Sequence, residues 1–181
     1  MRWQTLIEAD TRLTSAILIK ESKSIWRWLP IFFAHSGDSW FWLLGLGLVW
    51  FFGNQAWHDR AAFLGLGLFI LAVMVIFLKF SVRRPRPKGD WGQIYRATDP
   101  HSFPSGHAAR SAALAVMAIG VGPLWFSILL VIWAPLVGVS RIMLGVHYLS
   151  DVIIGWLVGI LMGLLALALY PLVVTKLPLL F

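Results

Sequence analysis

The sequence contains no cysteine, and this absence excludes several kinds of chemistry. Disulfide bonds, thiolate metal sites and a cysteine nucleophile all require a thiol. Acidic residues are also scarce, with 8 Asp and Glu against 15 Lys and Arg, which leaves a net charge of +7. No acidic cluster that would hold Mg²⁺ or Zn²⁺ is visible in the sequence. The excess of basic residues favours anionic partners.

Polar residues are scarce over most of the chain. Hydrophobic residues make up 59% of the 181 positions, and the mean hydropathy is +0.79. Such a composition is typical of polytopic membrane proteins, and the length fits a single domain over residues 1–181. The basic residues lie at predicted helix ends and in one loop. A phosphate-bearing lipid in the bilayer therefore fits them better than nucleic acid, which we do not expect as a partner.

The apolar residues form segments that predict membrane-spanning helices, because about 20 apolar residues cross the hydrocarbon core. Residues 1–36 mix apolar and charged side chains, which predicts an N-terminal amphipathic helix in the membrane interface. Glu8 and Asp10 lie where a cleavable signal peptide needs apolar residues, so we expect none. The predicted fold is an all-α, polytopic transmembrane bundle. It has five strong spans, and we favour a sixth, to which residues 25–36 would contribute. The strong spans are residues 39–53, 61–80, 107–122, 124–143 and 147–174.

Three short polar clusters interrupt the apolar sequence, each at the edge of a predicted span. Charged and titratable groups are costly there, so a functional role is the default interpretation. Because consecutive spans alternate in direction, we expect all three clusters on the same side of the membrane. The clusters are Lys79-x6-Arg86-Pro87, Pro104-Ser105-Gly106-His107 and Ser140-Arg141-x5-His147-x3-Asp151.

The third cluster supplies a candidate nucleophile. His147 and Asp151 are four residues apart, so they share one face of a helix. The carboxylate can accept a proton from one imidazole nitrogen and leave the other nitrogen free to attack phosphorus. His107 begins a different helix and is a candidate acid for the leaving oxygen. Taken alone, the His147–Asp151 pair would be better explained as a structural hydrogen bond.

The remaining cluster residues predict a phosphate-binding site. Arg86 and Arg141 offer planar donor forks that suit phosphate, and Lys79 adds a mobile positive charge. Backbone N–H groups at the helix start after Ser105 favour an anion, and Gly106 permits a close approach. These cations would neutralise phosphate charge in place of a metal ion, so we expect neither a metal nor a cofactor. Lys79 alone would be better explained as an interfacial anchor.

Together, the three clusters resemble the signature motifs of the type 2 phosphatidic acid phosphatase (PAP2) family, with no departure over residues 79–151. The resemblance implies that His147 forms a phosphohistidine, that Asp151 orients it, and that His107 is the general acid. It also implies metal-independent catalysis. The residues that the resemblance assigns to phosphate binding are Lys79, Arg86, Ser105, Gly106, Arg141 and Ser140.

The resemblance also implies a substrate class and a location. Small bacterial members of the family resemble undecaprenyl-diphosphate and phosphatidylglycerophosphate phosphatases, so we expect a lipid phosphatase acting on such lipids or on phosphatidic acid. Their site faces the outer, periplasmic side of the inner membrane. The positive-inside rule would instead place the Arg-rich segment 81–105 in the cytoplasm. Catalytic arginines are kept for chemistry and do not report on topology, so we favour the outer side for this segment. If a sixth span exists, the basic residues near the N-terminus would keep the N-terminus in the cytoplasm.

Other activities remain open at this point. A phosphotransferase would use the same intermediate and pass the phosphoryl group to another lipid. Vanadate-dependent haloperoxidases share the motifs, but they are soluble, and the hydrophobic spans argue against them. A non-catalytic lipid carrier would be expected to lack the catalytic residues, which are intact here. The charge of segment 81–105 exceeds what one phosphate needs, which favours a diphosphate lipid.

A few residues outside the clusters carry weaker predictions. Gly155, Gly159 and Gly163 repeat every four residues, which predicts close helix packing. Arg110 lies one turn into the helix of the second cluster and is a candidate to face the site. Three basic residues of the connecting segment are candidate contacts for a second phosphate or a head group, with attraction to anionic lipid as the alternative: Arg83, Arg84 and Lys88.

Overall fold

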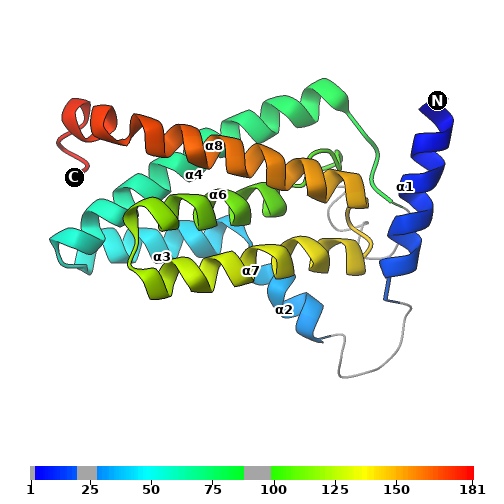
Figure 1. Cartoon of the computed structure of the whole chain (residues 1–181), viewed down its shortest axis with the longest axis horizontal. Helices are drawn as coiled ribbons and strands as arrows, with labels where there is room; N and C mark the ends of the chain where they lie inside the picture. Colours follow the sequence, from blue (N-terminus) through cyan, green and yellow to red (C-terminus); the bar gives the residue numbers. More distant parts are fainter. Residues whose placement is uncertain (1–2, 20–27, 88–98) are drawn as a thin grey trace.

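The computed structural model describes residues 3–19, 28–87 and 99–181, and in these residues the chain is helical, without a β-strand (Figure 1). The predicted all-α fold is confirmed. The helices are α1 (Trp3–Ile17), α2 (Trp28–Ser36), α3 (Ser39–Phe52), α4 (Gln55–Val82), α6 (Gly106–Val121), α7 (Leu124–Met143) and α8 (Leu149–Lys176).

The five predicted spans correspond to α3, α4, α6, α7 and α8. In the described part of the chain, α4, α7 and α8 are long and apolar enough to cross a membrane. The apolar helices α3 and α6 have 14 and 16 residues, so at 1.5 Å per residue they measure only about 21 and 24 Å. Helix α2 has nine residues, and residues 25–27 of the possible sixth span lie outside the described residues. The result is a membrane-type helical bundle.

Helix α6 forms the centre of the bundle and packs against α4, α7 and α8 (Figure 1). Its close approach to α8 depends on three glycines of α8. A Cβ on Gly159 would collide with the carbonyl of Ala109, and one on Gly155 would lie 2.6 Å from the carbonyl oxygen of Ser105. Gly163 similarly faces α6, where an added Cβ would lie 2.9 Å from a side-chain carbon. The predicted close packing by these glycines is confirmed, and it brings the start of α8 against the start of α6.

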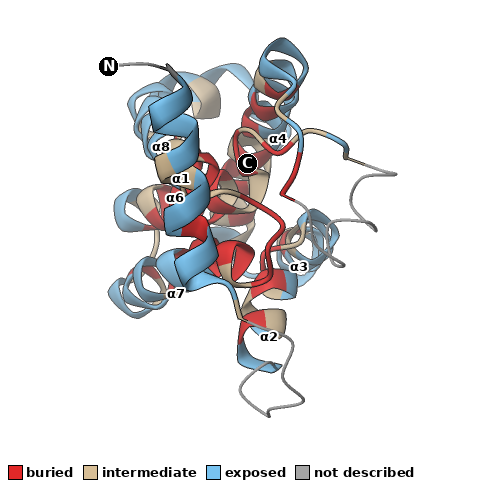
Figure 2. Cartoon of the chain, turned by 90° about the vertical axis from the view of Figure 1, so that its right-hand side faces the viewer, coloured by how far each residue is buried: buried red, intermediate tan, exposed pale blue. Residues whose placement is uncertain are grey.

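The outer faces of the bundle are apolar. Figure 2 shows buried residues gathered toward the interior and exposed residues on the outer helix faces. Phe52, Phe69 and Phe77 are each more than 60% exposed, as is Leu161 on α8. A surface of this kind matches lipid hydrocarbon rather than water, as expected of a membrane protein.

Helix α1 lies across the ends of α7 and α8, nearly perpendicular to them (Figure 1). The Thr14 hydroxyl accepts a hydrogen bond from the backbone N–H of Leu149 at 3.0 Å. The backbone N–H of Ile19 donates to the carbonyl of Met143 at 3.0 Å. Helix α1 therefore packs directly behind the turn that carries the third polar cluster, at the start of α8.

Candidate active site

Residues from all three polar clusters line one cavity of about 420 Å³ at the end of the bundle near α1. The convergence expected from alternating spans is therefore present in the structure. The cavity has a polar part and an apolar part, and the apolar part is formed mainly by α4. The polar lining comprises Lys79, Arg86, Asp99, Gly106, His107, Arg110, Arg141 and His147, and the apolar lining from α4 comprises Leu68, Leu71, Ala72, Val75, Ile76 and Phe80.

The first cluster places two buried cations around a carboxylate. Lys79, in the last turn of α4, donates through Nζ to the Asp99 side chain and to the carbonyl of His101 at 3.0 Å. Arg86 donates from Nη2 to Asp99 Oδ2 at 2.8 Å and from Nε to the Asp99 carbonyl at 2.7 Å. No spacing rule would have identified Asp99 from the sequence, because Asp99 lies 13 positions after Arg86 in a connecting segment.

Arg86 also joins the first cluster to the third. Its Nη1 donates to the carbonyl of Val146 at 2.9 Å and lies 3.3 Å from Nε2 of His147. On the other side of the imidazole, Nδ1 of His147 lies 3.6 Å from Oδ2 of Asp151, slightly beyond hydrogen-bond distance. This arrangement favours the tautomer with a proton on Nδ1, facing the carboxylate, and a lone pair on Nε2, facing the cations.

The electrostatic surroundings keep His147 neutral. Burial lowers the pKa of His147 to about 4, and the nearby positive charges of Arg141 and Arg86 act in the same direction. Asp151 acts in the opposite direction but does not offset these effects. A neutral imidazole with an available lone pair is the form that can act as a nucleophile.

Asp151 is held by contacts on both of its carboxylate oxygens and is fully buried. Its Oδ2 accepts a hydrogen bond from the backbone N–H of Tyr148 at 2.9 Å, which caps the first turn of α8. Its Oδ1 accepts from Nη1 of Arg84 at 2.7 Å. The helix cap and the arginine therefore fix the carboxylate in the position that faces His147.

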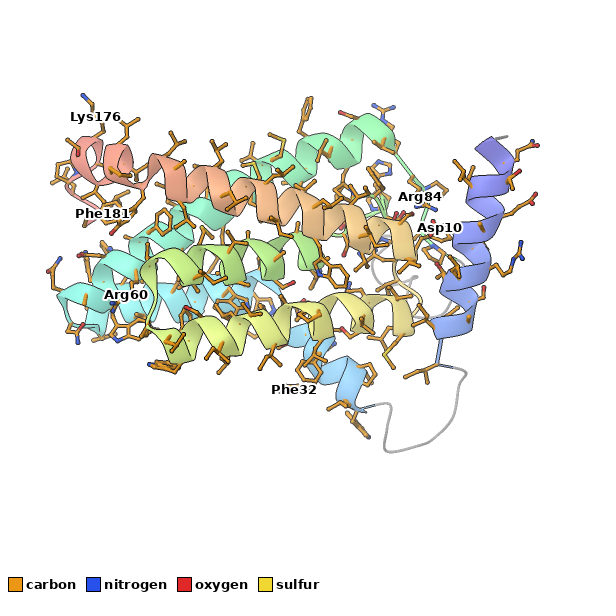
Figure 3. All side chains as sticks on the ribbon, viewed as in Figure 1. Asp10, Phe32, Arg60, Arg84, Lys176 and Phe181 are labelled. Atoms are coloured by element: carbon orange, nitrogen blue, oxygen red, sulfur yellow. The ribbon has the colours of Figure 1, made fainter. Side chains whose placement is uncertain are left out.

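Arg84 connects this carboxylate to helix α1. Its Nη2 donates to Oδ2 of Asp10 at 2.6 Å, and its Nη1 also donates to the Ser150 hydroxyl at 2.7 Å. Asp10 in turn accepts from the backbone N–H of Ser150 at 3.0 Å. Figure 3 shows Asp10 and Arg84 close together where α1 meets the end of the bundle. Arg83 and Arg84 are absent from the cavity lining, and Lys88 lies outside the described residues. The Arg84 guanidinium is held by the side chains of Asp10, Ser150 and Asp151.

The second cluster forms the start of α6. The backbone N–H of Ser105, the residue before the helix, donates to the carbonyl of Asp151 at 2.9 Å. The Ser105 hydroxyl is buried and has no hydrogen-bond partner among the residues that the structure describes. A Cβ on Gly106 would meet only Val75, at an ordinary 3.5 Å, so this position borders the open cavity. A buried hydroxyl and a helix start beside a cavity suit an anion.

His107 is paired with a carboxylate from another element. Its Nε2 lies 2.8 Å from Oδ1 of Asp38, in the turn between α2 and α3, and Oδ2 of Asp38 lies 3.0 Å from Nδ1 of His35. Burial tends to raise the pKa of Asp38, but the hydrogen bonds with His107 and His35 outweigh it and lower the pKa to about 2. Sequence spacing could not identify Asp38, which is 69 residues from His107.

The remaining predicted residues differ in their surroundings. Arg141 is 1% exposed at the end of α7 and lines the cavity. Ser140 is also buried, but its hydroxyl donates to the carbonyl of Val137 at 2.6 Å, and Ser140 is not among the lining residues. Arg110 lines the cavity, as predicted, while its guanidinium donates to the carbonyl of Gly37 at 2.6 Å.

The polar lining is suited to an anion. Lys79, Arg86 and Arg141 bring positive charge to the same cavity, where a metal ion would be repelled and a phosphate attracted. Within residues 3–19, 28–87 and 99–181, no group of three or more metal-ligating side chains occurs. The chemistry of the donors therefore corresponds to phosphate binding with a histidine at the centre.

Comparison with known proteins shows which sequences and folds this chain resembles. The sequence profile of the PAP2 superfamily matches residues 60–174. An undecaprenyl-diphosphatase from Sulfolobus acidocaldarius is 34% identical over an alignment of 139 residues. The alignment covers 72% of this chain and 64% of that protein, so the chain spans less than two thirds of the relative's length. The crystal structure of Aquifex aeolicus LpxE has a TM-score of 0.69 and 26% identity, with 87% of this chain and 94% of that chain covered. A transmembrane PAP2 type phosphatidylglycerolphosphate phosphatase from Bacillus subtilis has a TM-score of 0.70 at 24% identity, covering 90% and 84%, and shows likeness of fold.

Proposed function

This chain belongs to the PAP2 superfamily, and on that premise we propose that it is a membrane phosphatase that hydrolyses the phosphate or diphosphate group of a lipid. The observation that carries the proposal is the shared cavity, in which His147 and His107 lie among Lys79, Arg86 and Arg141. Each of these side chains comes from one of the three clusters. The proposal treats residues 1–181 as one domain with its catalytic residues in 79–151.

In the first step, the neutral imidazole of His147 attacks phosphorus through Nε2. The new P–N bond forms as the bond to the leaving oxygen breaks, and the electron pair of that bond goes to the leaving oxygen. His107 donates a proton to this oxygen. The Asp151 carboxylate, held by Arg84, stabilises the positive charge that develops on His147.

In the second step, water attacks the phosphohistidine. His107 accepts a proton from the water as the P–N bond breaks, which releases phosphate and restores neutral His147. Lys79, Arg86 and Arg141 neutralise the charge on the phosphoryl oxygens in both steps, which is the role a metal ion has in other phosphatases. Ser105 and Gly106 complete the phosphate site. Ser140, whose hydroxyl is bound to the Val137 carbonyl, supports it as the neighbour of Arg141 in the chain.

The apolar part of the cavity is suited to the substrate's hydrocarbon chain. Leu68, Leu71 and Val75 of α4 extend the lining from Lys79 toward the middle of the bundle. A phosphorylated head group bound at the cations would place the first part of its chain against this helix face. The name of the Sulfolobus relative favours a prenyl diphosphate as the first lipid to test, ahead of phosphatidylglycerophosphate and phosphatidic acid.

For the membrane arrangement we propose five spans, with the site at the outer, periplasmic side of the inner membrane. Helix α1 packs against the start of α8 beside the cavity, whereas a sixth span through α2 would separate α1 from that end. Leu6, Ile7 and Leu13 of α1 are exposed apolar residues. They would rest in the membrane interface and keep the helix parallel to it.

The decisive experiment measures phosphate release by the purified full chain from prenyl diphosphate and phosphatidic acid, with and without EDTA. We expect activity that EDTA leaves intact and that His147→Ala lowers by at least about a thousandfold. The matched control is His58→Ala, because His58 bonds the Trp50 carbonyl at 2.7 Å at the far end of α4. Brief reaction with ³²P-labelled substrate should trap acid-labile, alkali-stable label in the wild type.

Two results would overturn the proposal. Full activity in His147→Ala would exclude this nucleophile, and loss of activity in EDTA would exclude metal-independent chemistry. Adding an acceptor lipid separates hydrolysis from phosphotransfer, because a phosphotransferase would form a phosphorylated acceptor at the expense of free phosphate. A non-catalytic carrier would release no phosphate from any of these lipids.

A further inference from the structure

We propose that Asp38 is a positioning residue for the general acid, holding the His107 ring so that Nδ1 faces the leaving oxygen. This inference rests on the proposed function, because it assigns a partner to the residue that protonates the leaving group. Asp38 lies in the turn between α2 and α3, outside the stretch 60–174 that matches the family profile. It thus adds a carboxylate that none of the three clusters contains.

The contact between the two side chains is direct. Oδ1 of Asp38 lies 2.8 Å from Nε2 of His107, within hydrogen-bond distance. Both side chains are shielded, with 19% of Asp38 and 16% of His107 exposed. In such surroundings a hydrogen bond to an ionised carboxylate is stronger and more directional than in water.

The turn that carries Asp38 is itself fixed against α6 and α7. Arg110 donates to the carbonyl of Gly37 at 2.6 Å and also binds the hydroxyl of Ser39, on the two sides of Asp38. At Gly37 the backbone approaches so closely that an added Cβ would lie 2.8 Å from a Val137 methyl and 3.2 Å from Cδ2 of His107. The imidazole is therefore confined by the backbone of this turn as well as by the carboxylate.

This geometry determines which nitrogen can serve the reaction. When His107 is protonated, Nε2–H donates to Asp38 and Nδ1–H is the donor left for the leaving oxygen. As the ester bond breaks, its electron pair goes to that oxygen, which takes the proton from Nδ1. His107 becomes neutral and keeps its Nε2–H on Asp38, which stays ionised throughout. In the second step, Nδ1 takes one proton back from the attacking water.

A structural tie between two elements would produce the same contacts, so the test must depend on the leaving group. Leaving oxygens of low basicity need little protonation, whereas alkoxide leaving groups depend on it. The measured quantity is kcat/KM, which reports the steps up to formation of the phosphohistidine. The substrates are phosphatidic acid, phenyl phosphate and 4-nitrophenyl phosphate, tested with the full chain in detergent micelles.

The variants are Asp38→Ala, Asp38→Asn, His107→Ala and the double variant Asp38→Ala with His107→Ala. We expect Asp38→Ala to lower kcat/KM by about 10- to 100-fold for phosphatidic acid and by less than about threefold for 4-nitrophenyl phosphate. Asp38→Asn, whose amide oxygen can still accept from Nε2–H, should lose less than Asp38→Ala. In the His107→Ala background, removing Asp38 should have no further effect.

The control is Asp59→Asn, since Asp59 accepts a hydrogen bond from Gln55 at 2.7 Å at the opposite end of the bundle. An equal loss for all substrates in Asp38→Ala, or a further loss in the double variant, would overturn the inference. If His107→Ala shows leaving-group dependence and neither Asp38 variant does, only the role of Asp38 is overturned. If His107→Ala shows no such dependence, the assignment of the acid in the proposed function fails, and the inference fails with it.

Discussion

At the scale of single residues, the same cations serve two purposes in this site. Burial is the main cause of the lowered pKa of His147, and the charges of Arg141 and Arg86, which we propose bind phosphate, lower it further. A nucleophilic imidazole must be neutral, so positive charge that attracts the substrate also maintains the reactive form of the histidine. The requirement for substrate binding and the requirement for reactivity are thus met by one electrostatic arrangement.

The first prediction concerns the protonation of His147. In ¹³C-histidine NMR of the full chain, one of the five histidines should titrate near pH 4, and its signal should be missing in His147→Ala. Arg86→Gln should move that titration to higher pH because it removes a positive charge, and Arg86→Lys should not. A His147 signal titrating near 6.5, its ordinary value, in the wild type would contradict the prediction.

The lowered pKa of His147 also determines how the stability of the folded protein changes with pH. Between pH 6.5 and about 4 the unfolded chain protonates His147 and the folded chain does not. The unfolded state therefore binds more protons in this range, and the contribution of His147 to stability falls as the pH falls. His147→Ala should flatten this part of the pH dependence of the melting temperature.

The second prediction concerns Ser105 and Ser140, both of which the sequence motifs assign to phosphate binding. Neither serine lines the cavity, but the hydroxyl of Ser105, which precedes the lining residue Gly106, is buried without a hydrogen-bond partner among the described residues. The hydroxyl of Ser140 is bound to the Val137 carbonyl. Ser105→Ala should therefore weaken inhibition by inorganic phosphate by about tenfold, which corresponds to one hydrogen bond to a charged group. Ser140→Ala should change it by less than about threefold. Equal effects of the two substitutions would contradict this difference, and phosphate inhibition constants provide the measurement.

At the scale of elements, the reaction centre is assembled from helix ends. The starts of α6 and α8 are joined by the hydrogen bond from Ser105 N–H to the Asp151 carbonyl, and glycines of α8 let the two helices approach closely. Helix α1 then covers the start of α8 through Asp10 and Thr14. Motion of α1 would therefore be transmitted to Arg84 and from there to Asp151.

The sequence predicted the apolar helices and the convergence of the three clusters, because both depend on local patterns along the chain. Hydropathy identified the apolar helices. The i, i+4 spacing correctly brought His147 close to Asp151, but the prediction that both lie on one helix was wrong, because α8 begins at Leu149 and His147 lies in the turn before it. Asp10 and Asp38 were missed as site residues because their partners lie 140 and 69 residues away, at Ser150 and His107. Such contacts depend on how elements pack, and a single carboxylate in the middle of a helix, such as Asp10, or just before one, such as Asp38, has no distinctive local pattern.

The third prediction tests the link through α1. Asp10→Asn removes the charge that holds Arg84, so Asp151 should become less firmly placed and kcat should fall by about three- to tenfold. Arg84→Ala should cause the larger loss, because Arg84 contacts Asp151 directly. The control is Glu8→Gln, an exposed acidic residue on the same helix. Unchanged steady-state rates in Asp10→Asn and Arg84→Ala would show that α1 does not support the site.

At the scale of the whole molecule, the two ends of the bundle differ in kind. One end carries the cavity, Asp10 and Arg84, and the other carries Arg60, Lys176 and the C-terminus (Figure 3). The apolar helix faces lie between them. With five spans, the two ends would face opposite sides of the membrane, and the side that the cavity faces determines which pool of lipid head groups can reach it.

The last prediction uses the absence of cysteine to determine that side. Because the chain has no thiol, single cysteines introduced at Glu8 and at Asp59 provide unique labels at the two ends. Glu8 lies on α1 and Asp59 lies near the start of α4, at opposite ends of the bundle, and neither residue lines the cavity. A membrane-impermeant maleimide applied to cells with an opened outer membrane should label Glu8→Cys at once. It should label Asp59→Cys only after the inner membrane is permeabilised. The reverse pattern would place the site in the cytoplasm, as the positive charge of segment 81–105 would by itself suggest. Labelling of both cysteines without permeabilisation would contradict an odd number of spans between positions 8 and 59.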